Sequence, residues 1–315
     1  MNQTLKRLLN LAGALVSLIL IAYLASRFFE LRAAVASQIE NGLPLGILVS
    51  ASIVCLLAYI PISIAWALLT SERGHNFRNI PISLEIVLLS QAARYLPGNV
   101  GHLVGRVMLT RRYLGISATR GAALVTIELL LSLACAALLS SAAIPQLAPL
   151  APSWLSHILE QRYMVVIGVC AMVVALIVMA AATRRWLKFS LPSTHTLVSA
   201  GIFYAMALMI GGYALWLLLG SEHVRVVGVS LALLAYTTSW LAGFVTPGAP
   251  SGLGVREFIL VQLLSPAVGE PQALLAAALL RLCSVSADVV AFGIGLLLTR
   301  HFGRIRSAAS MASGK

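Results

Sequence analysis

The chain has 315 residues, of which 60% are hydrophobic and only 10% are charged, and its formal net charge is +12. This composition excludes an ordinary soluble globular domain and is typical of an integral membrane protein. The positive surplus does not indicate nucleic-acid binding. Most of the basic residues flank apolar segments, where such residues set orientation and meet anionic lipid.

Several apolar runs are long enough to cross the ~30 Å hydrocarbon core as helices. The six predicted spans cover residues 8–25, 46–70, 120–142, 163–183, 196–219 and 272–299. The first run lacks a clean small-x-small cleavage site, so we expect it to remain as a helix and not to be removed as a signal peptide. Two further apolar segments, 82–110 and 227–266, are interrupted by Pro and Gly, and we expect each to form a re-entrant helical hairpin.

The predicted fold is therefore an all-α polytopic membrane bundle, whose orientation follows from its basic residues. Most of the 22 basic residues fall in loops that share one side, and this side is predicted to be cytoplasmic. The assignment works only if each hairpin returns to the face from which it enters. It places both termini in the cytoplasm.

Two segments 150 residues apart are similar. "PGNVGHLVGR" at 97–106 and "PGAPSGLGVR" at 247–256 both begin with Pro-Gly and end in Arg nine residues later. The same offset superimposes the other predicted elements: 46–70 on 196–219, the first hairpin on the second, and 120–142 on 272–299. An odd number of crossings separates the copies, which predicts two inverted repeats, 1–150 and 151–315, as in many transporters.

The Pro-Gly pairs predict unwound hairpin tips. Proline removes a helix donor and glycine permits non-helical backbone, and such backbone is tolerated at membrane depth only beside protein or a wet cavity. We expect the second half-helices to begin near Asn99 and Ser251 as N-caps, with their positive ends facing the bilayer interior. Arg106 and Arg256 follow two turns later.

This arrangement predicts a site for a phosphate group. The other residues assigned to it are Gly98, Gly101, His102, Gly248, Gly252 and Gly254. The alternative is structural: each Pro-Gly pair is only a kink, and the spacing of Gly101 and Gly105 only permits close helix packing. Their matched positions in two inverted repeats favour the functional interpretation.

Ionisable residues at membrane depth need a partner, a cavity or a function, because an unpaired charge there costs at least ~2.5 kcal/mol. We predict an ion pair between Glu128 and Arg281, which lie on equivalent spans. Asp288 lies seven residues after Arg281 on the same helix face. Together with Arg94, Glu85, Glu257 and Asp288, this pair is predicted either to gate transport or only to hold the two repeats together.

No cofactor or metal is predicted. His102 precedes Arg106 by four residues; it either carries a proton or donates a hydrogen bond at the hairpin tip, and we favour the hydrogen bond. The other histidines show no metal-binding spacing. The cysteines lie in apolar helices without paired spacing, so a packing role is expected: Cys55, Cys135, Cys170 and Cys283.

Four segments carry a family resemblance: "RYLPGNVGHLVGRVMLTRRYLGIS", "TIELLLSL", "PGAPSGLGVREFILVQLL" and "AALLRLCSVSADVVAFGIGLLL". They resemble the membrane flippase region of bacterial lysylphosphatidylglycerol synthases and its free-standing relatives. Members are implicated in moving anionic or aminoacylated phospholipids, or polyprenyl-phosphate-linked sugars, between leaflets. The resemblance implies functional roles for the hairpin glycines and for Arg106, Glu128, Arg256, Glu257 and Arg281.

The chain also departs from the synthases. They carry a large soluble aminoacyl-transferase domain after the membrane region, whereas this chain stops at Lys315, so we expect it not to synthesise lysyl-lipid and not to be an enzyme. The "AP" in "PGAPSGLG" replaces a plainer glycine-rich stretch.

The sequence thus favours a lipid flippase whose substrate is an anionic or polyprenyl-phosphate lipid. Such a flippase could associate with a lipid or glycan biosynthesis enzyme. One alternative is a non-transporting membrane partner of an enzyme of this kind. The other is a membrane-embedded lipid-modifying transferase. For that reaction only Glu257 and His102 are candidates for a base or nucleophile, and neither has an activating partner in the sequence.

Overall fold

The computed structural model describes residues 3–40, 45–71, 79–95, 101–142, 192–219, 228–246 and 250–313, without the side chains of 3–14, 38–40, 95, 142, 250 and 301–313. Within these ranges every regular element is a helix, and no strand occurs. The predicted all-α class is therefore confirmed.

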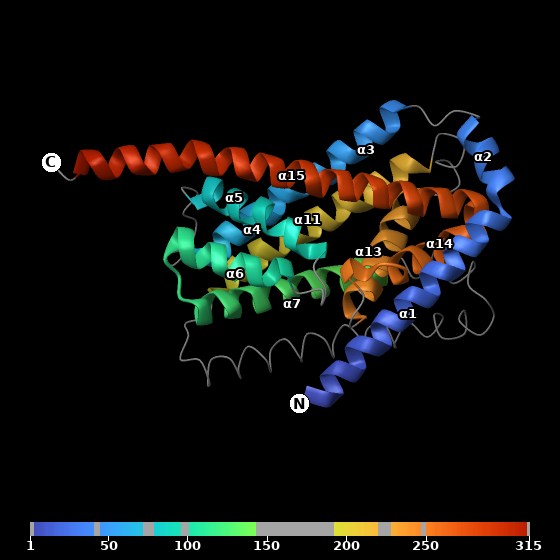
Figure 1. Cartoon of the computed structure of the whole chain (residues 1–315), viewed down its shortest axis with the longest axis horizontal. Helices are drawn as coiled ribbons and strands as arrows, with labels where there is room; N and C mark the ends of the chain where they lie inside the picture. Colours follow the sequence, from blue (N-terminus) through green and yellow to red (C-terminus); the bar gives the residue numbers. More distant parts are fainter. Residues whose placement is uncertain are drawn as a thin grey trace.

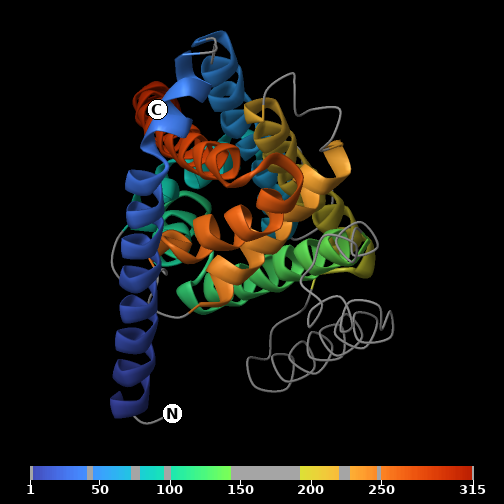
Figure 2. The same ribbon diagram turned by 90° about the vertical axis from the view of Figure 1, so that its right-hand side faces the viewer.

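The first group comprises the described helices before residue 150. They are α1 (Gln3–Glu30), α2 (Arg32–Glu40), α3 (Leu45–Leu57), α4 (Tyr59–Thr70), α5 (Ile80–Gln91), the short 3-10 helix η2 (Ala92–Tyr95), α6 (Gly101–Leu114) and α7 (Ala118–Ala142). Only Ala58 separates α3 from α4, so the two act as one long apolar segment. In Figure 2, α1 stands along one side of the bundle.

From α3 onward, the first group has the order long segment (α3 with α4), short helix (α5), short helix (α6) and long helix (α7). The described helices after residue 190 have the same order. They are α11 (Thr194–Leu218), α13 (Val229–Val245), the 3-10 helix η4 (Pro250–Gly252), α14 (Val255–Val268) and α15 (Glu270–Ser313). Figure 1 shows α15 running along the bundle and continuing beyond it to the C-terminus.

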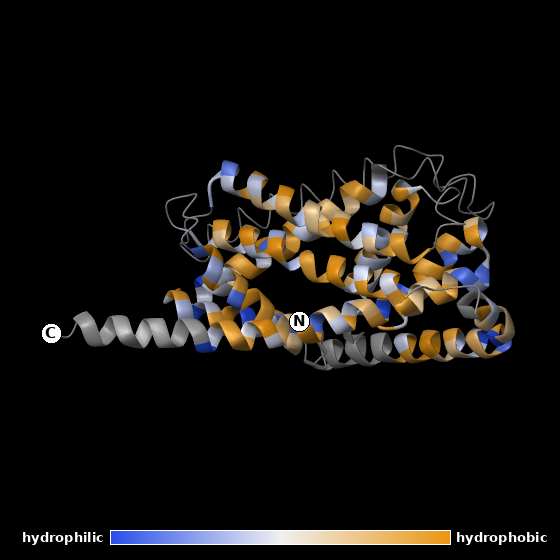
Figure 3. Ribbon diagram, turned by 90° about the horizontal axis from the view of Figure 1, so that it is seen from above, coloured by the Kyte–Doolittle hydropathy of each residue, from blue (hydrophilic) through white to orange (hydrophobic). Residues whose placement is uncertain are grey.

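Four helical segments are long and apolar enough to cross a bilayer: Leu45–Thr70, Ala118–Ser141, Thr194–Leu218 and Glu270–Arg300. They match four of the six predicted spans, and apolar residues are prominent across the bundle as a whole in Figure 3. The predicted span 8–25 lies within α1, and the predicted span 163–183 lies outside the described residues. The chain is a multi-pass membrane protein, whereas the count of six spans stays a prediction.

Each predicted hairpin segment forms two short helices that pack against each other, α5 with α6 and α13 with α14. These helices have 12, 14, 17 and 14 residues. At 1.5 Å per residue they are about 18 to 26 Å long, less than the ~30 Å hydrocarbon core. Each arm is therefore too short to cross the bilayer as an upright helix.

The two groups of helices interlock. Helix α5 packs against α15 of the other group, α13 packs against α7, and α4 packs along α11. Two apolar cores result: one surrounds Trp66, Ile86 and Leu124, and the other surrounds Leu215, Leu234 and Leu260. The short helices η2 and η4 contact each other between these cores, so the hairpin tips meet inside the bundle.

Candidate functional site

A cavity of about 180 Å³ lies where the hairpin tips meet. Both hairpins and the long helices α4, α7, α11 and α15 contribute side chains to its wall. Its charged lining residues are Arg94, Arg106, Glu128, Arg256 and Asp288. The predicted site residues His102, Ser251 and Gly252 also line it.

The positive charge of Arg106 is balanced by its neighbours. Arg106 lies on α6, is only 2% exposed, and donates from Nη1 to the Glu128 carboxylate on α7. Its guanidinium carbon lies 5.5 Å from the centre of the Trp66 ring, and Nη2 lies 3.5 Å from Ser90 Oγ. The positive charge is thus balanced by a carboxylate and an aromatic face, although the residue lines the cavity.

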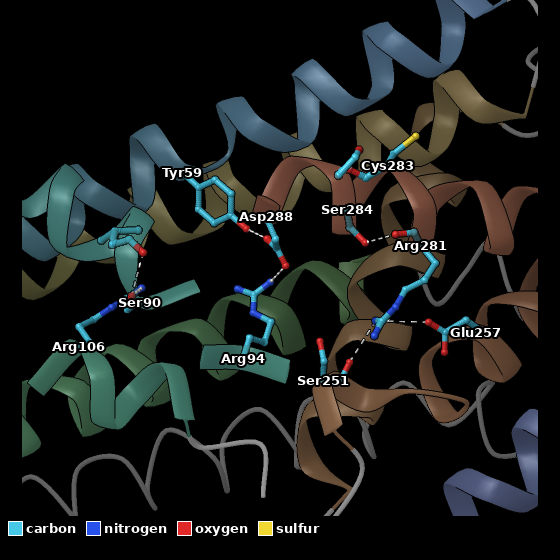
Figure 4. Close-up of polar contacts among 12 residues, drawn as sticks. Tyr59, Ser90, Arg94, Arg106, Ser251, Glu257, Arg281, Cys283, Ser284 and Asp288 are labelled. Atoms are coloured by element: carbon cyan, nitrogen blue, oxygen red, sulfur yellow. Dashed lines mark hydrogen bonds and ion pairs between the residues drawn. The ribbon is translucent and has the colours of Figure 1, made fainter. Parts of the chain in front are cut away.

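Arg281 is paired in the second hairpin, so the predicted ion pair between Glu128 and Arg281 is wrong. Arg281 Nη1 lies 3.6 Å from Glu257 Oε1 on α14 and donates to the Ser251 carbonyl oxygen at 3.4 Å (Figure 4). The prediction rested on the similar depth in the membrane that Glu128 and Arg281 would have on equivalent spans. Each long helix, however, packs against its own neighbouring short helix, and each ion pair forms there.

The two ion pairs are charge-swapped counterparts. In the first, the short helix α6 supplies the arginine and the long helix α7 supplies the carboxylate. In the second, the short helix α14 supplies Glu257 and the long helix α15 supplies Arg281. Each pair therefore ties a hairpin arm to the long helix that follows it in the chain.

A third buried cluster connects the two groups of helices. Asp288 on α15 is 3% exposed; its carboxylate accepts a hydrogen bond from the Tyr59 hydroxyl of α4 and lies 3.5 Å from Arg94 Nη1 of η2 (Figure 4). The sequence analysis named Arg94 and Asp288 as charged residues at depth but did not pair them. Their separation along the chain leaves no local signal for the contact.

Arg256 differs from the other cavity cations. It lies in the first turn of α14, is half-buried, and its guanidinium carbon lies 4.8 Å from the centre of the Tyr236 ring. No carboxylate among the described side chains lies within ion-pair distance of it. Arg256 is thus the unneutralised positive charge in the described wall of the cavity.

The second hairpin tip is built from left-handed backbone. Ser251, Gly252 and Gly254 have φ values of 53°, 68° and 82°. A side chain at Gly252 would place a Cβ 2.9 Å from the Gly243 Cα, and one at Gly254 would place it 2.7 Å from the Ser17 carbonyl oxygen of α1. Both positions require glycine for close packing as well as for conformation.

This turn shifts the start of the half-helix, so the predicted N-cap at Ser251 is wrong. Helix α14 begins at Val255 with Gly254 as its N-cap. The Gly254 N–H donates to Glu257 Oε2 at 2.7 Å, so the chain's own carboxylate covers one of the free donors of this helix end. The anion attraction of α14 therefore rests mainly on Arg256.

The first tip is described only in part. Helix α6 begins at Gly101, whereas Gly98, Asn99 and the Gly248 of the second tip lie outside the described residues. His102 lines the cavity, and its Nδ1 is buried without a hydrogen bond to the described part of the chain. The predicted hydrogen bond is therefore not made through Nδ1 within that part.

Glu85 does not line the cavity, and of the described cysteines only Cys55 does. Glu85 is fully buried on α5. The described cysteines Cys55, Cys135 and Cys283 are free thiols, and Cys170 lies outside the described residues. No group of three or more potential metal-ligating His, Cys, Asp or Glu side chains occurs within the described ranges.

Fold and site together define a multi-pass helical membrane protein with two interlocked hairpins around a charged central cavity. Residues 10–291 match the family described as the lysylphosphatidylglycerol synthase TM region. The chain belongs to this family, as its motifs predicted. No curated protein matches the chain.

Proposed function

We propose that the protein moves a phosphate-bearing anionic lipid, a phospholipid or a polyprenyl-phosphate-linked sugar, between the leaflets of a bacterial inner membrane. The observation that carries the proposal is Arg256, an arginine without a carboxylate partner in the described wall of a cavity between apolar helices. An embedded charge of this kind is costly and usually marks a ligand pathway. Arginine binds phosphate through several N–H groups.

The arrangement of the helices supports transport by two inverted repeats. The order of elements before residue 150 recurs after residue 190, and each hairpin packs its first arm on the last long helix of the other group. Transporters built from inverted repeats bind their substrate where the repeats meet and alternate access by rocking one repeat against the other. The cavity occupies this position.

In the proposed mechanism the lipid tails stay in hydrocarbon while the headgroup enters the cavity. The phosphate binds the Arg256 guanidinium, whose stacking on Tyr236 orients it at low entropic cost. Arg106 and Arg94 add positive potential but remain tied to Glu128 and Asp288. Rocking of the repeats then opens the loaded cavity to the other leaflet.

The transferase alternative is weakened by the surroundings of Glu257. Its carboxylate accepts from the Gly254 N–H and lies beside Arg281, and neither contact activates it as a base. A non-transporting partner of a lipid or glycan biosynthesis enzyme would use the same fold but would tolerate the loss of Arg256. Mutation of this residue separates the two roles.

The test is a translocation assay with purified protein in liposomes. Fluorescent phosphatidylglycerol and a short polyprenyl-phosphate sugar are followed by quenching of the outer leaflet with dithionite. We expect protein-dependent movement of at least one of them, a loss of about tenfold or more in Arg256→Gln, equivalent to one lost interaction of ~1.4 kcal/mol, and partial recovery in Arg256→Lys.

The matched control is Arg32→Gln, which removes an exposed arginine of α2. It should translocate at the wild-type rate. Absence of movement of any anionic lipid, where a known scramblase works, or full activity of Arg256→Gln would refute the proposal.

A further inference from the structure

The family resemblance implies both anionic and aminoacylated lipids as substrates. The charges in the cavity distinguish between these two kinds of headgroup. Lipids of net negative charge and aminoacylated lipids both carry a phosphate, but an aminoacylated headgroup also carries ammonium groups. Such a group needs a carboxylate or an open aromatic face as its partner. The state of the cavity carboxylates therefore decides whether it is accommodated.

Both carboxylates that line the cavity are already balanced by an arginine. Glu128 is paired through Oε1 with Arg106, while its Oε2 is buried without a hydrogen bond to the described residues. Asp288 is 3% exposed and is bound by Tyr59 and Arg94. An ammonium at Glu128 would lie beside Arg106, and one at Asp288 would lie beside Arg94, so the attraction of each carboxylate is offset by the repulsion of its arginine.

The aromatic rings nearest Arg106 and Arg256 each face a guanidinium, so an ammonium there would lie beside a positive charge. The Arg106 guanidinium lies over Trp66, and the Arg256 guanidinium lies over Tyr236. Trp240 and Phe244, which also line the cavity, stack on each other with ring centres 5.4 Å apart and planes 11° from parallel. In the described wall of the cavity the surplus charge is positive, and His102 adds either no charge or a further positive one.

We infer that the cavity selects a lipid headgroup of net negative charge, through Arg256, and rejects aminoacylated, cationic headgroups such as lysyl-phosphatidylglycerol. This inference rests on the proposed function for the identity of the cavity as the lipid site. It assigns Arg256 as the residue that sets headgroup charge specificity. It also separates this chain's substrate from the lysyl-lipid that gives the family its description.

The inference is tested by binding, so that its outcome does not depend on transport. The detergent-solubilised full chain is mixed with equal amounts of phosphatidylglycerol and lysyl-phosphatidylglycerol of identical acyl chains, and bound lipid is counted by native mass spectrometry. A short polyprenyl phosphate is tested in a separate arm against the same lysyl-lipid, which distinguishes the two sources of the phosphate. We expect a preference of about tenfold or more for at least one anionic lipid.

Arg256→Gln should bring this binding ratio close to one, while Arg256→Lys and the control Arg32→Gln should keep it. Equal or preferential binding of the lysyl-lipid by the wild-type chain would overturn the inference, whether or not the protein translocates lipid. A preference that persists in correctly folded Arg256→Gln, judged by helical circular dichroism and gel filtration, would overturn the assignment to Arg256. Selective binding without translocation would sustain the inference and refute the flippase.

Discussion

The Arg106–Glu128 pair offers a quantitative test of how the bundle accommodates buried charge. Glu128→Gln leaves a guanidinium that is 2% exposed without its counter-ion. Removing one partner of a buried ion pair typically costs about 3–5 kcal/mol. Because the Trp66 ring and Ser90 Oγ still face the guanidinium, we expect the lower end of this range, about 3 kcal/mol.

The assay is reversible unfolding in mixed micelles, titrated with dodecyl sulfate and followed by circular dichroism, for wild type, Glu128→Gln, Arg106→Met and the double variant. The double variant removes both charges together, so it should be more stable than Glu128→Gln alone. A loss below about 1 kcal/mol in Glu128→Gln, or strictly additive effects of the two substitutions, would refute the reasoning that the pair is buried and coupled.

Three further outcomes are expected. Gly252→Ala should lower the free energy of unfolding by about 1–3 kcal/mol, because the φ of 68° and the close contact with Gly243 exclude a methyl group. The control is Gly293→Ala, whose added methyl group would meet nothing within 4 Å. It should be neutral or slightly stabilising in the same titration. Glu257→Gln should lower the free energy of unfolding by about 1–2 kcal/mol, since it loses the charge facing Arg281 and weakens the helix cap. Glu257→Ala, which removes the capping acceptor altogether, should lower it further. Equal losses in the two variants would contradict the capping role. A fluorescent-protein fusion after residue 315 should fluoresce and an alkaline phosphatase fusion there should be inactive; the reverse result would invert the predicted orientation.

Much of the fold is predictable because its signals are local. Apolar runs match four candidate spans, and Pro-Gly interruptions mark the two pairs of short helices. The spacing of Gly254 and Glu257 also carried a local signal that the sequence analysis missed. A capping residue followed three positions later by Glu is a capping pattern, and it places the start of α14 after Gly254 and not after Ser251.

Partners of buried charges are less predictable, because they depend on which helices pack together. The sequence identified each charge that needed a partner at depth, including Glu128, Arg281 and Asp288. Similar depth on equivalent spans suggested the wrong partner for Glu128, and nothing local could indicate that Asp288 meets Arg94. That no carboxylate of the described side chains pairs with Arg256 emerges only once those carboxylates have been located in the fold.

The distribution of the ion pairs bears on how the two groups of helices can move. Arg106–Glu128 and Glu257–Arg281 each lie within one group, so they persist when one group moves as a rigid body against the other. The contacts of Asp288 with Arg94 and Tyr59 cross between the groups. A motion that separates η2 from α15 must break the contact between Arg94 and Asp288, whereas the contact between Tyr59 and Asp288 depends on α4. For the proposed rocking mechanism we therefore expect the contact between Arg94 and Asp288 to act as a gate.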